Sequence, residues 1–219
     1  MPPARPAPPK TERRLPIVPI VVVAVAVLAI VAVVVSRGGG DDDGGGSADL
    51  AAGVQATRPV EVSGDPLPRL EGGGADPASG SVAPTLTGAT FDGSPVEIGA
   101  DGTPKLLFFV AHWCPHCNRE VPIVTEWLGG ASSKDGVDVY AVSTGVDEAA
   151  PTFPPSEWLE EEGWPAPVLA DDAEGSAAEA YGLSAYPFFV LLDGDHEVIG
   201  RGSGELSEEA LDALVAAAG

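Results

Sequence analysis

Cys114 and Cys117 are the only cysteines in the chain, and Pro115 and His116 separate them in the run Trp-Cys-Pro-His-Cys. Two thiols at this spacing can close a reversible disulfide, which predicts thiol–disulfide exchange. In that reaction a thiolate attacks a substrate disulfide, and the second cysteine resolves the mixed disulfide that forms. We expect Cys114 to be the nucleophile and Cys117 to be the resolving cysteine.

Metal binding and a structural role are the other uses of such a pair. A zinc site needs four ligands, but the chain has no second cysteine pair and only three histidines. Covalent haem attachment needs a histidine directly after the second cysteine, where this chain has Asn118. A structural disulfide across so short a loop would remove little chain entropy. Binding of a soft metal such as copper(I), as in a metal chaperone, stays open for the set His112, Cys114, His116 and Cys117.

The segments around the cysteines predict how they are positioned. Residues 105–110 consist of Lys105 followed by five apolar residues, a run that predicts a strand buried on both faces. A helix is predicted over Pro115–Leu128, with Pro115 in the first turn, where a missing N–H is tolerated. Cys114 would then lie at the positive end of the helix dipole, which favours a thiolate, and His116 can add positive charge beside it.

The rest of residues 82–219 alternates between strand and helix patterns and is long enough for one compact domain. This alternation predicts an α/β fold, a mixed sheet with helices on both faces. Further strands are expected at 137–143, 188–192 and 197–202, a small hairpin at 90–98, and helices at 156–162, 173–181 and from Ser207 onward.

The N-terminal segment predicts a membrane anchor. Residues 1–14 are rich in proline and basic residues and are expected to form a disordered cytoplasmic tail. Residues 15–36 are apolar and long enough to cross a bilayer, so we expect one transmembrane signal anchor; a cleaved signal peptide is the alternative. The positive residues before this span put the N-terminus in the cytoplasm and the C-terminal domain outside. Residues 37–81, rich in Gly, Asp and Pro, predict a flexible linker.

The charge balance excludes some partners. The chain has 33 acidic and 11 basic residues and a formal net charge of −22. Most of this charge lies in the C-terminal domain, so nucleic acid and anionic lipid are not expected to bind that domain.

Several spaced motifs resemble those of the TlpA/ResA-like membrane-anchored thiol–disulfide oxidoreductases. They are Ala83-Pro84 with Phe91-Asp92-Gly93, Trp113-Cys114-x-x-Cys117, Glu120-x-Pro122, and Tyr181-Gly182 with Tyr186-Pro187. The resemblance covers residues 82–219 and implies a thioredoxin-like fold and no bound cofactor. It implies exchange with cysteine pairs of secreted or membrane-associated proteins, and an upstream membrane thiol that donates or accepts electrons.

The resemblance also assigns roles in the site. It makes Cys114 an exposed nucleophile, Cys117 its buried partner, and Pro187 a cis-proline that faces the disulfide. Tyr186 would present backbone groups to a substrate segment. Glu120 has an independent argument, because it lies three residues after Cys117 on the same helical face. We expect it to accept the Cys117 proton.

Departures from the pattern bear on the direction of the reaction. The Pro115-His116 dipeptide is that of oxidising DsbA-like proteins, whereas relatives on this scaffold are mostly reductants. We expect a protein-disulfide oxidoreductase and prefer the reductase direction over the oxidase direction. A peroxidase is less consistent with the sequence, since Ala111 stands where peroxiredoxins carry threonine or serine. Trp113 is expected to pack beside the site, and His196 to lie on the surface.

Overall fold

The computed structural model describes residues 53–72, 74–130 and 136–218. The predicted tail at 1–14 and the predicted anchor at 15–36 lie outside the described residues. Within the described ranges, the structure has no helix that is both long and apolar enough to cross a membrane.

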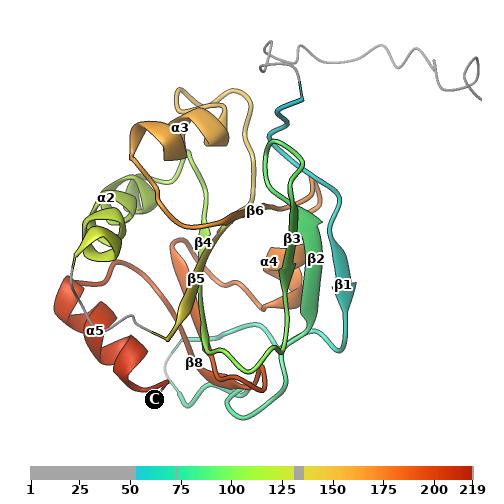
Figure 1. Ribbon diagram of the computed structural model, residues 1–219, viewed down its shortest axis with the longest axis vertical. Coiled ribbons are helices and arrows are strands. Elements are labelled where there is room, and N and C mark those ends of the chain that lie inside the picture. Colours follow the sequence, from blue (N-terminus) through green and yellow to red (C-terminus); the bar gives the residue numbers. More distant parts are fainter. Residues whose placement is uncertain (1–52, 73, 131–135, 219) are drawn as a thin grey trace, which may run out of the picture. The chain divides into compact units, whose positions relative to one another are not determined.

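A central mixed sheet positions the cysteine pair (Figure 1). In the described part of the chain its strand order is β6-β5-β4-β7-β8. The middle strand β4 (Lys105–Val110) runs parallel to β5 (Asp138–Ser143) and antiparallel to β7 (Phe188–Leu192). β6 (Val168–Ala170) pairs with β5, and β8 (Val198–Ser203) pairs with β7. Every residue of β4 and β7 is buried, as expected of strands that are covered on both faces.

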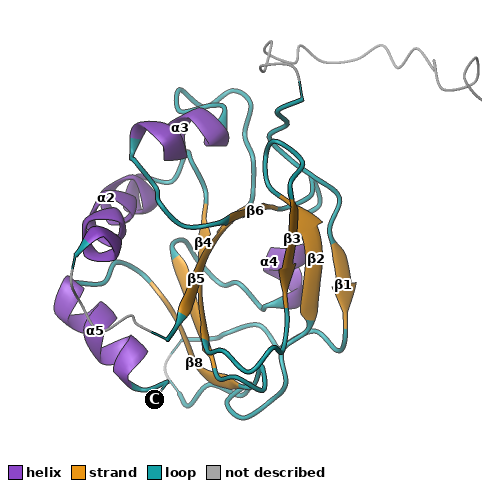
Figure 2. Ribbon diagram, viewed as in Figure 1, coloured by secondary structure: helices purple, strands orange, loops and turns teal. Residues whose placement is uncertain are grey.

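Helices cover both faces of this sheet, which confirms the predicted fold class (Figure 2). α2 (Pro115–Gly129), α3 (Pro155–Glu161) and α5 (Glu208–Ala216) lie on one side, and α4 (Ser176–Ala180) lies on the other. The side chains of β4 divide accordingly, with Phe108 in the core beneath α2 and its neighbours Leu107 and Phe109 in the core beneath α4.

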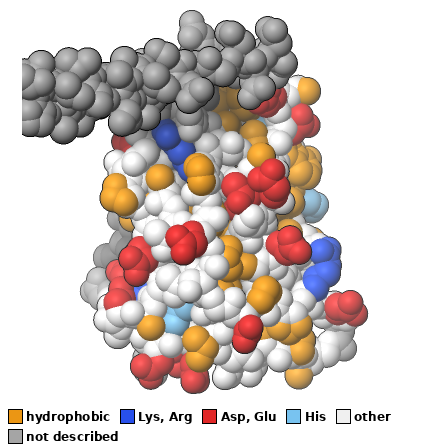
Figure 3. Space-filling view, turned by 90° about the vertical axis from the view of Figure 1, so that its right-hand side faces the viewer, with side chains coloured by type: hydrophobic (Ala, Val, Ile, Leu, Met, Phe, Trp, Pro, Cys, Tyr) orange, Lys and Arg blue, Asp and Glu red, His pale blue; other side chains and the backbone are white. Residues whose placement is uncertain are grey.

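A small antiparallel sheet packs on the α4 side. It consists of β1 (Glu61–Ser63), β2 (Thr85–Ala89) and β3 (Pro95–Ile98). The turn between β2 and β3 contains Asp92 and Gly93, and Gly93 has a φ of 89°, which glycine adopts readily. The predicted Asp-Gly turn and the strand after it are confirmed, but the first strand of the hairpin lies before the predicted start at residue 90. Figure 3 shows this side of the molecule, where acidic side chains are spread among uncharged ones and basic side chains are few.

The linker predicted at 37–81 is wrong for its second half. β1 pairs with β2, and Leu67 is buried in the core. Arg201 binds Asp76 through two hydrogen bonds of 2.6 and 2.9 Å and also donates to the Pro68 carbonyl. These contacts join residues far apart in the sequence, so local Gly and Pro content does not reveal them. The folded domain begins before residue 82.

His196 is buried, contrary to the surface position predicted for it. Its side chain is in the core, 3.0 Å from the Tyr181 hydroxyl and 3.3 Å from the Pro84 carbonyl oxygen. The segment that leads into β2 covers the turn, because Ala83 donates its N–H to the His196 carbonyl. Burial lowers the pKa of His196.

Two smaller differences concern the region around β6. The sequence prediction missed β6, which is only three residues long. The helix predicted at 173–181 is shorter and spans Ser176–Ala180. Its start is fixed because the carboxylates of Asp171 and Asp172 accept hydrogen bonds from the N–H groups of residues 176–178.

Candidate active site

The two cysteines lie at the junction between β4 and α2. Cys114 is the N-cap residue of α2, in an extended conformation, and Pro115 occupies the first turn as predicted. Both thiols are free. Cys117 is fully buried, as the resemblance implied, but Cys114 is only 6% exposed, so the exposed position implied for it is wrong. The Cys114 Sγ lies 4.0 Å from the Tyr186 carbonyl oxygen, and the loop that carries Tyr186 covers it.

Cys117 lies in an apolar core together with Val121 and Phe108. Burial raises the pKa of the Cys117 thiol well above its ordinary value, because a thiolate there would lose its hydration. A resolving step through Cys117 therefore needs a proton acceptor close by.

Glu120 is the carboxylate that the structure buries on the same helix. It is 1% exposed, and both of its oxygens accept from the Leu206 N–H at 3.1 Å. The pKa of Glu120 is raised to about 7, mainly by burial and to a smaller extent by the negative charge of Glu205, while the hydrogen bond from Leu206 opposes the rise. A carboxyl group that titrates near neutral pH can both take and return a proton. The role of Glu120 as acceptor of the Cys117 proton stays a prediction.

The loop before β7 faces Cys114. The Tyr186–Pro187 peptide bond is cis, as the resemblance implied. Trp113 is 41% exposed, and its indole N–H donates to the Gly145 carbonyl at 2.5 Å. Its ring packs edge-on against the Tyr186 ring, with 5.8 Å between the ring centroids. Tyr186 therefore contacts both Cys114 and the Trp113 ring, and the roles assigned to Trp113, Tyr186 and Pro187 stay predictions.

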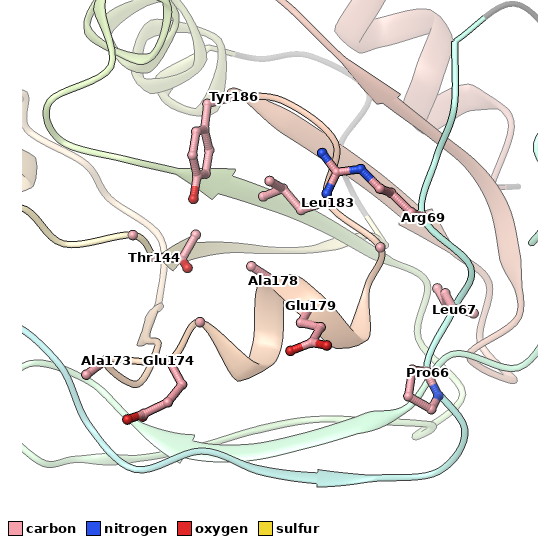
Figure 4. Close-up of a pocket in the computed structure, with 13 residues that line it drawn as sticks. Pro66, Leu67, Arg69, Thr144, Ala173, Glu174, Ala178, Glu179, Leu183 and Tyr186 are labelled. Carbon is pink, nitrogen blue, oxygen red and sulfur yellow. The ribbon is translucent and has the colours of Figure 1, made fainter.

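A cavity of about 600 Å³ opens beside Tyr186 (Figure 4). Its apolar wall includes Leu67 and Leu183, and Glu179 and Arg69 contribute charged groups. The Tyr186 hydroxyl points toward Thr144 in this view. Sequence patterns do not reveal this cavity, because its walls come from segments that are distant along the chain.

His116, Arg119 and Glu205 form a cluster on the exposed face of α2. Arg119 and His116 both contact the Glu205 carboxylate, at 2.5 and 2.6 Å respectively. These hydrogen bonds lower the pKa of Glu205, and the bond from Arg119 has the larger effect. His116 was predicted to lie near Cys114, but no sequence signal pointed to Arg119 or to Glu205, which is 86 residues further along the chain.

The His112 ring is held by hydrogen bonds within the protein. Its ring is buried, with Nε2 accepting from the Asp147 N–H at 3.1 Å and Nδ1 3.3 Å from the Thr152 hydroxyl. Among the residues that the structure describes, no group of three or more His, Cys, Asp or Glu side chains could hold a metal ion. The geometry thus gives the copper alternative no ligand set that includes His112.

The Redoxin family matches residues 63–216, a range that starts at the last residue of β1 and includes the cysteine pair. The chain belongs to the Redoxin family. This redoxin is 33% identical over 133 residues to a thiol:disulfide interchange protein DsbE homolog of Paracoccus denitrificans, covering 59% of this chain and 69% of that protein. It is 29% identical over 138 residues to the soluble secreted antigen MPT53 of Mycobacterium tuberculosis, covering 62% of this chain and 73% of that protein.

Solved structures confirm the thioredoxin-like fold of this redoxin. The dsbF protein of Mycobacterium tuberculosis superimposes with a TM-score of 0.51 at 26% identity, over 61% of this chain and 94% of that one. The thioredoxin domain of a thiol-disulfide oxidoreductase from Bacteroides vulgatus gives a TM-score of 0.51 at 26% identity, over 64% and 96%. These relatives and the free cysteine pair support a thiol:disulfide oxidoreductase.

Proposed function

We propose that this redoxin is an extracytoplasmic thiol–disulfide oxidoreductase that works through Cys114 and Cys117. One observation carries the proposal: the more accessible thiol lies at the start of α2 against the Tyr186 carbonyl, and the buried thiol shares its helix with the buried carboxyl of Glu120. This arrangement separates the attacking group from the resolving group and gives the resolving thiol a proton acceptor.

In the reductase direction, the Cys114 thiolate attacks a substrate disulfide. An S–S bond forms between Cys114 and one substrate sulfur, and the other substrate sulfur leaves as a thiolate. Cys117 then transfers its proton to Glu120 and attacks Cys114. This breaks the mixed disulfide and releases the second substrate thiolate. The substrate gains two electrons, and the Cys114–Cys117 pair loses them as it becomes a disulfide.

The substrates that we propose are proteins with cysteine pairs. A substrate segment that approaches Cys114 meets the backbone of Tyr186, where strand-like pairing can hold it in register. The adjoining cavity, with Leu67 and Leu183 on its apolar wall, is suited to a neighbouring substrate side chain. No bound cofactor is needed in this scheme, because the two thiols carry the electrons.

The cellular location is also a proposal. The apolar residues 15–36 and the basic residues before them support a single-pass anchor in the cell membrane, with the N-terminus in the cytoplasm. The electrons would then come from, or go to, a membrane thiol protein upstream. Reporter fusions after Gly46 are expected to be active only outside the cytoplasm, and release of the domain into the medium would contradict the anchor.

Trapping tests the chemistry and identifies the substrates. A Cys117→Ala variant leaves the mixed disulfide unresolved, so cellular proteins are expected to accumulate as adducts on Cys114. A matched variant that also carries Cys114→Ser should trap none. Adducts that resolve at the wild-type rate in Cys117→Ala would contradict the proposal.

A further inference from the structure

Three charged side chains, which we name the charge cluster, lie on the exposed face of α2 close to Cys114. They are His116, Arg119 and Glu205. Arg119 donates from Nη2 to Glu205 Oε1 at 2.5 Å and from Nε to both carboxylate oxygens at 3.1 and 3.3 Å. His116 Nδ1 lies 2.6 Å from the same Oε1. Disulfide exchange by itself does not require this cluster.

The protonation state of His116 determines which member of the cluster it binds. His116 Nδ1 also lies 2.8 Å from Arg119 Nη2, a contact in which the imidazole nitrogen must accept. The contact with Glu205 instead requires an N–H donor at Nδ1. Glu205 therefore binds the histidine when Nδ1 carries a proton, and it binds Arg119 in either case.

Glu205 is also connected to the buried side of the helix. The next residue, Leu206, donates its N–H to both oxygens of Glu120. Residues 205 and 206 thus contact both faces of α2, one through a side chain and the other through the backbone. His116 lies two residues and Arg119 five residues after Cys114, in the first two turns of α2, and the hydrogen bond to Glu205 raises the pKa of Arg119.

We propose that Glu205 is a positioning residue that holds His116 and Arg119 beside Cys114 and offsets their positive charge. The consequence is a weaker oxidant than Arg119 and a protonated His116 would produce without Glu205. The proposal rests on the exchange function proposed above. Positive charge near Cys114 stabilises the thiolate of the reduced form, and a stabilised reduced form makes the disulfide more oxidising. Glu205 opposes this effect.

Equilibration of the full chain with glutathione tests the role of Glu205. The reaction is protein disulfide plus two glutathione thiols, giving protein dithiol plus glutathione disulfide. For Glu205→Gln we expect the equilibrium constant for reduction to rise about twofold to fivefold, the scale of exposed charge interactions. Arg119→Gln should lower it by a similar factor. Glu126→Gln is the matched control. It also removes one negative charge, but from a position on α2 roughly 18 Å along the helix from Cys114.

Salt dependence distinguishes charge from a purely structural effect. Both shifts should shrink at about 1 M salt, where screening is strong. An unchanged constant in Glu205→Gln, shifts of the same sign in both variants, or shifts that persist in high salt would overturn the role of Glu205. A wild-type chain that does not equilibrate with glutathione at all would instead contradict the exchange function.

Discussion

The two faces of α2 differ in how their ionisable groups are solvated. On the exposed face, His116 and Arg119 contact a carboxylate that is exposed to solvent. On the buried face, Glu120 and Cys117 are removed from water, and the pKa values of both groups are raised. Charge on the exposed face can adjust a redox equilibrium by small steps, whereas burial decides whether a group is ionised at all.

Replacing each cysteine by serine in turn should give the largest effects and should distinguish the roles of the two thiols. Cys114→Ser removes the accessible nucleophile, so catalysed disulfide exchange should be abolished. Cys117→Ser should leave Cys114 able to attack and should accumulate mixed disulfides, which mass spectrometry of trapped adducts would detect. Adducts formed through the buried Cys117 in a Cys114→Ser variant would reverse the assignment.

Glu120→Gln tests the buried face. An amide cannot take the Cys117 proton, so the steps that require a Cys117 thiolate should slow by about a hundredfold, as expected when a general base is lost. The rise of this rate with pH around 7, which follows ionisation of Glu120, should disappear. Alkylation of Cys114 should change much less. Rapid-mixing kinetics of resolution would show this, and an unaltered resolution rate would remove Glu120 from the mechanism.

The same substitution should change stability with a defined sign. The pKa of Glu120 rises from an ordinary 4.5 to about 7 in the folded state. Below pH 4.5 the carboxyl is neutral in both states, but between pH 4.5 and 7 only the unfolded state ionises, so the wild type loses stability as the pH rises. Glu120→Gln lacks this loss and should be more stable than wild type by on the order of 2–3 kcal/mol at pH 8, but not at pH 4. Urea unfolding at both pH values measures the difference.

The exposed face should produce the smallest change. For wild type we expect a reduction potential on the order of −160 to −230 mV, between thioredoxin and DsbA. His116→Pro should make it more reducing by about 30 mV or less, since the Glu205 carboxylate offsets the histidine charge. Equilibration against glutathione measures both values. A shift as large as the gap between thioredoxin and DsbA would mean that the exposed face controls the chemistry after all.

The sequence was sufficient where local pattern and structure coincide. The strands Lys105–Val110 and Phe188–Leu192 were predicted with the bounds that the structure gives them, because strands buried on both faces are continuous apolar runs. The start of α2 followed from Pro115. Glu120 was found because helical periodicity places it near Cys117.

The sequence was insufficient where long-range contacts decide the structure. Residues 54–81 resemble a linker in composition, yet Asp76 is bound by Arg201, 125 positions away. Glu205 resembles any surface acid until the fold brings it to His116. His196 follows a turn pattern that normally lies in solvent, and only the segment over it makes it buried. In each case the deciding partner comes from another part of the chain.

The bond between Arg201 and Asp76 sets a limit on how far the domain can be shortened from its N-terminal side. The Arg201 side chain is fully enclosed. If the chain were severed at residue 82, its guanidinium would remain inside the protein without its carboxylate, a loss that is strongly destabilising for a buried pair. β2 would also lose its pairing with β1. The smallest portable unit of this oxidoreductase therefore includes β1 and the stretch after it, and a designed fusion must join upstream of Glu61.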